Sequence, residues 1–573
     1  YQADPITLFS IHPKQKSRRR NKKRKMTDVV KNLENAIDAM NSNENFFDVT
    51  IICTTDDHQA EYWMDCLSQG IIGSASRSKK SNGEEGTATK QQKSSFPIVL
   101  AVSEDWNDSG GAGNGLGTLY AFQKAHKLAS EKYQLDLEKM LLEKEISAAL
   151  YHTAGKGTRL APLPASENNN KPGVKLPFCH QVDENKYEPL SVLEAVVKQT
   201  GVYAPSRKGR LSVFWGDQVF IPSVDFEYTP THHVDILCTL LGSKAPTAEE
   251  WVEQGLDKYG VIAVIESSGD DATTEAAQVE KVSHETATSM LTKLGTIGAV
   301  GPSLGSFSVS GQILQLLCQE FQDELTKKEG KLDTDPHFWM PLTLSKQDYL
   351  TLMKQKGVEE DESSPHFDRM EKLKSKAKED FADSKLGLFG AVDVGKDASW
   401  WDYGQLKLYS KNSLLLLGDP NKKEGDRDEA ALLRKFLGLA GDDKVFDSST
   451  VSSSEDIQVD ETSFVFATTA SKGKIQNSVV SSCRAVEMEL DGAIVVNCTA
   501  KSIKAGKGSI LYNVTSSEDI EVGDGEVVVN VTDEKGESFS LKSRMDIDGG
   551  KAWKQKLEMN EFSFEDVHKN NKN

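Results

Sequence analysis

The sequence predicts an α/β protein with a mixed, mainly parallel sheet, followed by a C-terminal parallel β-helix. Short apolar runs rich in β-branched residues, at 48–53, 96–102 and 146–151, are separated by segments with helical character. Such runs are typical of buried parallel strands joined by crossover helices. Glycine-rich loops follow the second and third runs, where open α/β sheets bind ligands. Late in the chain, three similar octapeptides repeat at almost constant spacing, as stacked coils do.

Charge and composition narrow the classes of function. The 573 residues carry a net charge of −19, and the sequence pI of about 5.2 argues against a general nucleic-acid-binding face. No apolar run reaches the roughly eighteen residues that a membrane-spanning helix needs. The seven cysteines are scattered without a Cys-x-x-Cys pair, which indicates reduced thiols. We therefore expect a cytoplasmic protein, or a plastid one if a transit segment precedes the first residue.

Composition divides the chain into consecutive segments. Residues 1–25 are strongly basic and are expected to form a disordered tail. The α/β domain is expected at 26–417, with mobile insertions at about 73–95 and 355–385, where the sequence is polar or highly charged. The second insertion is expected to be helical and solvated. The remaining segments are an acidic linker at 418–462 around one short helix, Glu429–Leu439, the β-helix at 463–560 and a polar tail at 561–573.

The first two predicted strands precede the first glycine-rich stretch in the sequence. The run 48–53 leads into Thr54-Thr55-Asp56-Asp57, which favours a helix start. The run 96–102 leads into the glycine-rich stretch 109–118, after which we expect a helix from about Leu119. The glycines of this stretch alternate singly, so it fits neither Gly-x-Gly-x-x-Gly nor a Walker loop. A flexible turn is the alternative interpretation.

The third run carries the most specific motif. It ends in His152-Thr-Ala-Gly-Lys-Gly-Thr-Arg159, and Lys171-Pro172 follows shortly afterwards. Glycines let the backbone approach a phosphate closely, with its N–H groups facing the anion. Arg159 adds a permanently charged fork suited to a pyrophosphate, and Lys171 adds a second cation. The alternative is a tight turn with a solvent-facing arginine.

Polar residues also follow the later predicted strands. The apolar run 211–215 ends in Gly216-Asp217, and a carboxylate in this position lies where open α/β sheets place ligands. Gly-Asp is also common in ordinary turns. Further candidates stand in the segments Tyr259-Gly260, Glu280-Lys281, Gly305 and Trp401-Asp402.

The octapeptide repeats predict the architecture of the last domain. Residues 492–499, 508–515 and 525–532 share the pattern Gly-x-x-x-x-Asn-x-Thr. Short β-rich repeats of this length are typical of a parallel β-helix. The repeat explains the three asparagines as turn residues, so they are not interpreted as glycosylation sites.

The run Gly-Lys-Gly-Thr-Arg159, followed by Lys171-Pro172, resembles the signature of the sugar-1-phosphate nucleotidyltransferases, the nucleotide-sugar pyrophosphorylases. A predicted strand and a glycine loop precede this motif in the sequence. This order of elements resembles the permuted arrangement of fucose-1-phosphate guanylyltransferase. The resemblance implies a Rossmann-like (GT-A-like) catalytic domain and a left-handed β-helix. We also expect runs 48–53 and 96–102 to be central strands of the sheet that contains 146–151.

The resemblance also implies the roles of the candidate residues. Arg159 would hold the β- and γ-phosphates, Lys171 would stabilise the α-phosphate, and Asp217 and Asp402 would hold Mg²⁺. The nucleotide would bind at Gly113, Gly115, Gly117, Thr118, Ala154, Gly155, Gly157 and Thr158. The sugar phosphate would bind at Tyr259, Gly260, Glu280, Lys281 and Gly305. The match at Glu280-Lys281 is incomplete, because Val282 stands where the family has proline.

The expected reaction transfers a nucleotidyl group from an NTP to a sugar 1-phosphate and releases pyrophosphate. The permuted order favours GTP and fucose 1-phosphate, while UTP or ATP and another sugar stay open. A non-catalytic regulatory or scaffold paralogue is the other alternative, and a homo-oligomer is left open. A hexapeptide-type acyltransferase is not favoured, because residues 451–567 contain no histidine.

Overall fold

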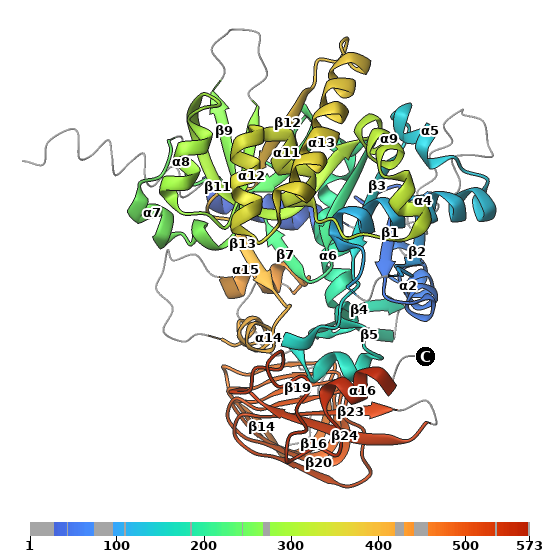
Figure 1. Ribbon diagram of the computed structural model, residues 1–573. Coiled ribbons are helices and arrows are strands. Elements are labelled where there is room, and N and C mark those ends of the chain that lie inside the picture. Colours follow the sequence, from blue (N-terminus) through green and yellow to red (C-terminus); the bar gives the residue numbers. More distant parts are fainter. Residues whose placement is uncertain are drawn as a thin grey trace, which may run out of the picture.

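The structure is a computed structural model of the chain. It describes residues 28–570, apart from 43, 74–95, 108–109, 184–185, 243, 267–274, 419–428, 440–455 and 533–535. The predicted basic tail at 1–25 and nearly all of the predicted insertion at 73–95 lie outside the described residues. A large α/β domain stands above a smaller domain of stacked strands (Figure 1). None of the described helices is long and apolar enough to cross a membrane.

Four parallel strands form one half of the main sheet. They are β1 (Val49–Thr54), β2 (Ile98–Ser103), β3 (Ser147–His152) and β6 (Arg210–Trp215), in the spatial order β6-β3-β1-β2. The prediction that the first two runs join the third in one sheet is confirmed, because β1 pairs in parallel with both β2 and β3. β2 is the edge strand and not a central one. The first 150 residues therefore contribute strands to the main sheet.

The other half of this sheet is mixed. β11 (Thr296–Ser310) pairs antiparallel with β6, β8 (His232–Cys238) and β9 (Gly260–Glu266). β10 (Ala276–Glu280) pairs antiparallel with β9, whereas β12 (Gly387–Asp393) pairs in parallel with β8. The expectation of a mixed, mainly parallel sheet in an α/β fold is confirmed at this level.

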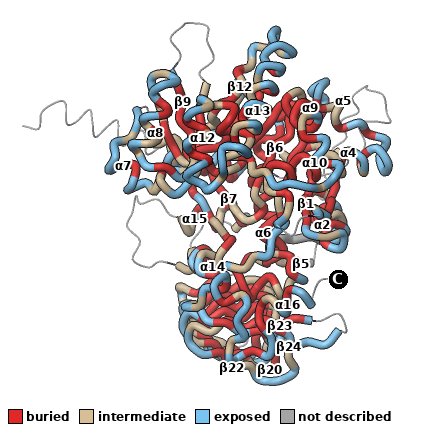
Figure 2. Tube along the Cα trace, viewed as in Figure 1, coloured by how far each residue is buried: buried red, intermediate tan, exposed pale blue. Residues whose placement is uncertain are grey.

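Helices cover both faces of the sheet and create a core on each (Figure 2). Along β1, Ile52 contributes to one core and Ile51 to the other, because successive strand side chains point to opposite faces. The α-helices are α2 (Asp57–Gln69), α4 (Gly113–Tyr133), α5 (Leu137–Leu142), α6 (Val192–Thr200), α7 (Ala248–Glu253), α8 (His284–Leu291), α9 (Gly311–Glu320), α10 (Gln322–Lys327), α11 (Met340–Thr343), α12 (Lys346–Gln355), α13 (Glu360–Asp380), α14 (Leu406–Leu414), α15 (Glu429–Phe436) and α16 (Phe564–Asn570).

Short elements connect the larger ones. The 3-10 turns are η1 (Thr158–Leu160), η2 (Leu163–Glu167), η3 (Lys171–Gly173), η4 (Gly201–Arg207) and η5 (Leu256–Lys258), and η6 (Thr334–Trp339) is a π-helix. Two small antiparallel pairs lie outside the main sheet: β4 (Lys175–Asp183) with β5 (Lys186–Ser191), and β7 (Gln218–Ile221) with β13 (Ser399–Asp402).

Helix α4 begins earlier than predicted. The expected glycine loop continued to residue 118, but the helix starts at Gly113. Distant backbone and side-chain groups accept the N–H groups of its first turn: the Asp333 carboxylate accepts from Asn114 (3.0 Å), and the Leu332 carbonyl from Gly115 (2.8 Å). These tertiary contacts replace an N-cap side chain, so a glycine-rich sequence becomes helical.

The segment 355–385, which we expected to be a mobile, solvated helical insertion, is mainly helical but packs against the core. Its main element, α13, buries Phe367, Met370 and Leu373 on one face. The spacing of these three residues matches one face of an α-helix, and the many charged residues occupy the other faces. The expected helix is present, and its narrow apolar stripe explains why it is packed rather than solvated on all sides.

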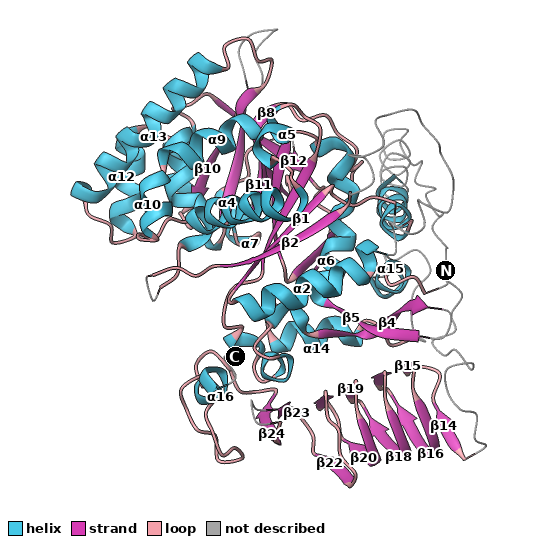
Figure 3. Cartoon of the chain, turned by 90° about the vertical axis from the view of Figure 1, so that its right-hand side faces the viewer, coloured by secondary structure: helices cyan, strands magenta, loops and turns pink. Residues whose placement is uncertain are grey.

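The last domain is built from two sheets of stacked strands (Figure 3). One contains β14 (Ile457–Val459), β16 (Thr469–Gln476), β18 (Arg484–Asp491), β20 (Thr499–Ala505) and β22 (Asp519–Val522) in that order. The other contains β15 (Phe464–Phe466), β17 (Val479–Ser481), β19 (Ile494–Val496), β21 (Ile510–Tyr512), β23 (Glu526–Thr532) and β24 (Ser538–Arg544). All neighbours are parallel except β23 and β24.

The repeats predicted from the sequence stack on one another in this domain. Ile494 pairs with Ile510, and Ile510 pairs with Val527, so equivalent repeat positions lie in register. Asn497 and Asn513 adopt positive φ angles of 55° and 52°, as turn asparagines do. Their side chains also form a hydrogen bond of 2.6 Å, which links consecutive turns.

The predicted linker and tail both contain helices. Helix α15 matches the short helix expected in the linker at Glu429–Leu439, and it buries Leu433 and Phe436 against the α/β domain. The segment expected as a polar tail contains α16, whose Phe564 and Val567 belong to the same core. In α16, a few apolar side chains at helical spacing outweigh a polar composition.

Candidate functional site

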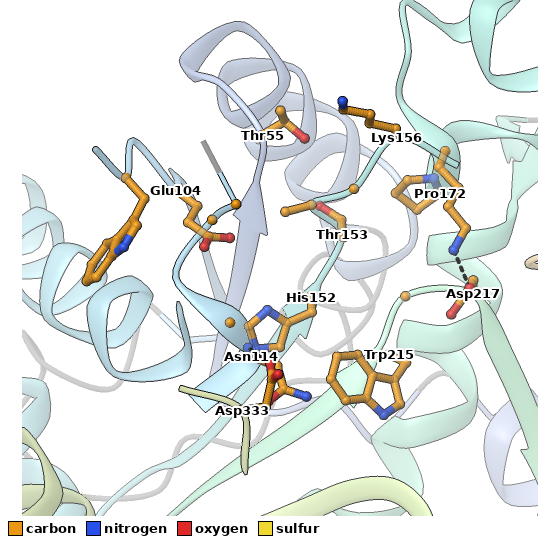
Figure 4. Close-up of a pocket in the computed structure, with 18 of the residues that line it drawn as sticks. Thr55, Glu104, Asn114, His152, Thr153, Lys156, Pro172, Trp215, Asp217 and Asp333 are labelled. Atoms are coloured by element: carbon orange, nitrogen blue, oxygen red, sulfur yellow. Dashed lines mark hydrogen bonds and ion pairs between the residues drawn. The ribbon is translucent and has the colours of Figure 1, made fainter. Parts of the chain in front are cut away.

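A cavity of about 750 Å³ opens at the carboxyl ends of the four parallel strands (Figure 4). Thr55 follows β1, Glu104 follows β2, Thr153 follows β3, and Trp215 ends β6; all four line the cavity. The N-terminal end of α4 closes one side. Open α/β sheets bind ligands at this edge, because loops at the carboxyl ends of the strands converge there.

The start of α4 forms one wall. Gly113 and Asn114 line the cavity, and the N–H of Ala112 donates to Glu104 Oε1 over 2.9 Å. Gly113 has φ +73°, and a β-carbon there would lie 2.5 Å from the Leu332 carbonyl oxygen, so only glycine fits. Burial raises the pKa of the Glu104 carboxyl above its ordinary value.

The remaining predicted residues of this stretch lie behind the wall. Gly115 and Gly117 are buried within α4, and Thr118 Oγ1 lies 2.8 Å from His152 Nε2. Burial lowers the pKa of His152 to about 4, so its imidazole is neutral at neutral pH. Among the three glycines predicted to bind the nucleotide, Gly113, Gly115 and Gly117, Gly113 alone is among the described residues that line the cavity.

The loop after β3 forms the opposite wall. Ala154, Gly155 and Lys156 line the cavity, and all three are exposed. Gly155 has φ +131°, and a β-carbon there would meet no atom within 4 Å, so its backbone is accessible to a ligand. Gly157 packs against Lys171, since a β-carbon on this glycine would lie 3.1 Å from Cβ of the lysine.

Lys171 and Asp217 line the cavity, and Asp402 lies beside Asp217 without being among the described residues that line it. The Lys171 ammonium forms an ion pair with the Asp217 carboxylate, drawn as the dashed line in Figure 4. Pairing of β13 with β7 places Asp402 opposite Gln218, next to Asp217. The pKa of Asp402 is raised, first by burial and then by the Asp217 charge, while Lys171 and Arg159 oppose the shift.

Arg159 lies on η1 beyond the cavity wall. Its side chain is exposed, and it is not among the described residues that line the cavity. Its charge still acts on Asp402, where it opposes the rise in the pKa of that carboxyl. Thr158, its neighbour, directs its backbone carbonyl towards Gly549 rather than into the cavity.

The predicted sugar-phosphate residues are divided between two places. Gly305 abuts the cavity, since a β-carbon there would lie 2.4 Å from Nε1 of Trp215. None of Tyr259, Gly260, Glu280 and Lys281 is among the described residues that line the cavity. They stand at the β9–β10 edge of the sheet, where η6 packs against β10 and a β-carbon on Gly260 would lie 2.9 Å from Oδ2 of Asp335.

Glu280 and Lys281 already have partners at this edge. Glu280 pairs with Lys281 over 2.9 Å and with Lys356 over 2.7 Å, and these cations lower its pKa against the opposing effect of burial. The Lys281 ammonium also feels the charges of Asp335 and of the cavity residue Asp333. The two places are therefore adjacent, with η6 between them.

Sequence reasoning missed several residues of the cavity. Glu104, Asn114, Trp215, Lys331, Asp333 and His568 line it, but none was a candidate. Glu104 could have been found, because it stands two residues after the predicted strand 96–102. Asp333 and His568 could not, because only the folded chain brings them beside residues far away in the sequence.

The two carboxylates fit a magnesium ion whose other ligands are phosphate oxygens and water. Asp217 and Asp402 supply two neighbouring carboxylates, and burial followed by the Asp217 charge raises the pKa of Asp402. A divalent cation would offset both effects by stabilising the ionised carboxylates. Within the described ranges, no cluster of three or more histidine, cysteine or acidic side chains forms a complete protein cage for a metal.

No protein-family model matches the sequence, and the search of curated proteins finds no similar sequence. The chemistry of the site therefore has to be inferred from its own residues.

Proposed function

We propose that the protein transfers a nucleotidyl group from an NTP to a sugar 1-phosphate, releasing pyrophosphate. The observation that carries the proposal is a single cavity lined by Gly113, Gly155, Lys171 and Asp217, with Asp402 alongside Asp217. Two glycine walls and a cation beside paired carboxylates suit a magnesium nucleotide. A volume of about 750 Å³ is large enough for a nucleotide and part of a second substrate.

The glycine walls would bind the nucleotide. The exposed backbone at Gly155 would be accessible to phosphate oxygens. Gly113 lines the opposite wall, where the neighbouring N–H groups of Asn114 and Gly115 already donate to Asp333 and Leu332. Lys156 adds a cation on the same loop. Arg159 would hold the leaving pyrophosphate at the rim of the cavity, because its guanidinium matches two phosphate oxygens at once.

Lys171 would stabilise charge on the α-phosphate. In the structure its ammonium is paired with Asp217, so a bound nucleotide would draw Lys171 towards phosphate. Asp217 and Asp402 would hold Mg²⁺, which when bound supplies positive charge to the phosphates. The attacking sugar phosphate is already an anion, so positioning and charge neutralisation carry the rate without a strong general base.

The sugar phosphate would enter on the Gly305 side, beside Trp215. Glu280 and Lys281 are not among the described residues that line the cavity, so their contact with the sugar phosphate would require a rearrangement of the β9–β10 edge. We further propose that the α/β domain is Rossmann-like, of the GT-A-like type, and that the C-terminal strands form a left-handed β-helix. Because a strand and a glycine loop precede the Arg159 motif, as in fucose-1-phosphate guanylyltransferase, we favour GTP and fucose 1-phosphate as the substrates.

The decisive experiment measures pyrophosphate release with GTP, UTP and ATP against a panel of sugar 1-phosphates, with and without Mg²⁺. One pair should give Mg²⁺-dependent turnover and a nucleotide sugar. Nucleotide binding without turnover of any pair would instead support a non-catalytic regulatory paralogue. Failure to bind any of the three nucleotides would refute both.

A further inference from the structure

Residues 546–570, called the buttress segment below, pack directly against the glycine loop. A β-carbon at Gly549 would lie 2.5 Å from the Thr158 carbonyl oxygen. At Gly550 it would lie 3.7 Å from Cγ of Arg159. The backbone of the buttress segment thus approaches the loop more closely than a residue with a side chain would allow at Gly549.

Aromatic side chains anchor the buttress segment on the same loop. Trp553 and Phe564 enclose a small gap together with Gly157 and Pro162. The Trp553 ring lies 6.4 Å from that of Phe564 and 5.5 Å from that of His568. Phe564 is 3% exposed, so this contact is part of the core.

The buttress segment also reaches the main cavity. His568 lines it together with Lys156 and Gly155, although His568 and Lys156 lie 412 positions apart in the sequence. Asn169 Nδ2 donates to the His568 carbonyl oxygen over 2.9 Å, which fixes the backbone at this point. The His568 ring is therefore held at the wall by both its backbone and Trp553.

The loop needs such support. Ala154, Gly155 and Lys156 are exposed, and Gly155 and Gly157 both have positive φ angles. A loop of this composition has many conformations, and ordering it when a nucleotide binds costs affinity. A fixed surface on its outer side removes part of that cost before the ligand arrives.

We propose that the buttress segment is part of the nucleotide site, with Gly549 as a positioning residue for the glycine loop and His568 as a nucleotide-binding residue. The imidazole of His568 donates a hydrogen bond to a phosphate oxygen at the Gly155–Lys156 wall. This inference rests on the proposed function, since the ligand is the NTP of that reaction.

The test compares four variants of the full chain. His568→Ala removes the donor, and Gly549→Ala pushes a methyl group against the Thr158 carbonyl. His126→Ala, on helix α4, and Gly242→Ala, where a β-carbon meets nothing within 4 Å, are the matched controls. We measure Kd by calorimetry for GTP, UTP and ATP, KM for each substrate, kcat and the thermal midpoint.

His568→Ala should raise Kd and KM for the NTP roughly tenfold, as expected for one lost hydrogen bond to a charged group, and leave KM for the sugar 1-phosphate unchanged. A further variant, His568→Gln, keeps an N–H donor and should recover part of the loss. Gly549→Ala should raise the NTP KM and lower kcat, because it displaces the loop and Arg159 together. Both controls should behave as the native chain does.

The outcomes separate this inference from the proposed function. A native chain that binds none of the nucleotides overturns both. If the native chain binds and turns over its NTP while His568→Ala keeps the native Kd, the inference alone is wrong. A change confined to the sugar-phosphate KM also overturns it. If Gly549→Ala does not fold, the alanine and glutamine variants of His568 decide the question.

Discussion

Lys171 and Asp217 show how single residues define the candidate site. Lys171 begins the 3-10 turn η3 and Asp217 follows β6, and they meet as an ion pair at the base of the cavity. Asp402 arrives from β13, nearly two hundred residues later, through pairing with β7. Three charged groups thus converge although none is near another in the sequence.

Arg159→Ala should reduce pyrophosphate release by roughly 100-fold, the usual cost of removing one donor that stabilises developing charge. The side chain is exposed on η1, so the thermal midpoint should stay native. Arg484→Ala, on an exposed position of β18, is the control. Near-native turnover of Arg159→Ala would remove Arg159 from the site.

Asp402→Asn should abolish Mg²⁺-dependent turnover without destabilising the fold. The amide keeps the side-chain volume, and it removes a charge that both burial and Asp217 disfavour. Titration of activity with Mg²⁺ measures the effect, and Asp65→Asn, exposed on α2, is the control. An unchanged Mg²⁺ dependence would contradict the shared metal site.

Asp335 provides a test of pH dependence. Burial raises its pKa from 3.8 to about 6, so the native state holds this proton where the unfolded state has released it. Its stabilising contribution is complete below about pH 4 and is lost as the pH rises through about 6.

Asp335→Asn should therefore be more stable than the native chain at pH 8, by on the order of 2 kcal/mol, and similar to it near pH 4. Denaturant unfolding at the two pH values measures this difference. Asp383→Asn, at an exposed position, should show no such change. A gain that is equal at both pH values would rule out titration of Asp335 as the cause.

Among the elements, α4 and α13 show why local sequence was an incomplete guide. The glycines of α4 disfavour a helix, yet the Asp333 carboxylate and the Leu332 carbonyl satisfy its first turn. In α13, charged residues predominate, but a stripe through Met370 joins the core on one face of the sheet. Tertiary contacts decided both elements.

Met370→Ala should destabilise the protein by about 3 kcal/mol, because it leaves a cavity at a fully buried position of α13. Lys372→Ala, on the exposed face of the same helix, should change stability by less than about 0.5 kcal/mol. Urea unfolding of both variants measures the difference. If both substitutions changed the free energy of unfolding by equally small amounts, the packing of α13 would contribute little to stability.

The two domains of the molecule share one core. Ile494 and Tyr512 of the stacked strands belong to the same cluster as Val174 and Tyr409 of the α/β domain. Hydrogen bonds cross the boundary as well: the Lys175 N–H donates to the Tyr512 hydroxyl over 2.7 Å. The stacked strands are therefore a structural support for the loops that carry Lys171.

We expect calorimetry to show one cooperative unfolding transition for both domains, because separating them would expose this shared core. Tyr512→Ala should lower the midpoint of that single transition. Two resolved transitions, with the variant shifting only one of them, would show that the domains unfold independently.

Much of the molecule was predictable from local patterns. Apolar β-branched runs indicated β1, β2 and β3, the octapeptide repeats indicated the stacked strands, and the glycine-rich turns indicated where a ligand cavity would form. These features follow from side-chain periodicity and backbone freedom, which are properties of neighbouring residues.

Which side chains line the cavity depended on contacts between residues that lie far apart in the sequence. Asp333 caps α4, β13 delivers Asp402, and the buttress segment brings His568 to the cavity, yet none of these placements has a local signature. Each depends on which surfaces pack together, and packing is decided by the whole chain because buried groups find their partners far away in sequence. Local patterns thus predicted the strands and the loop, whereas packing decided which side chains face the ligand.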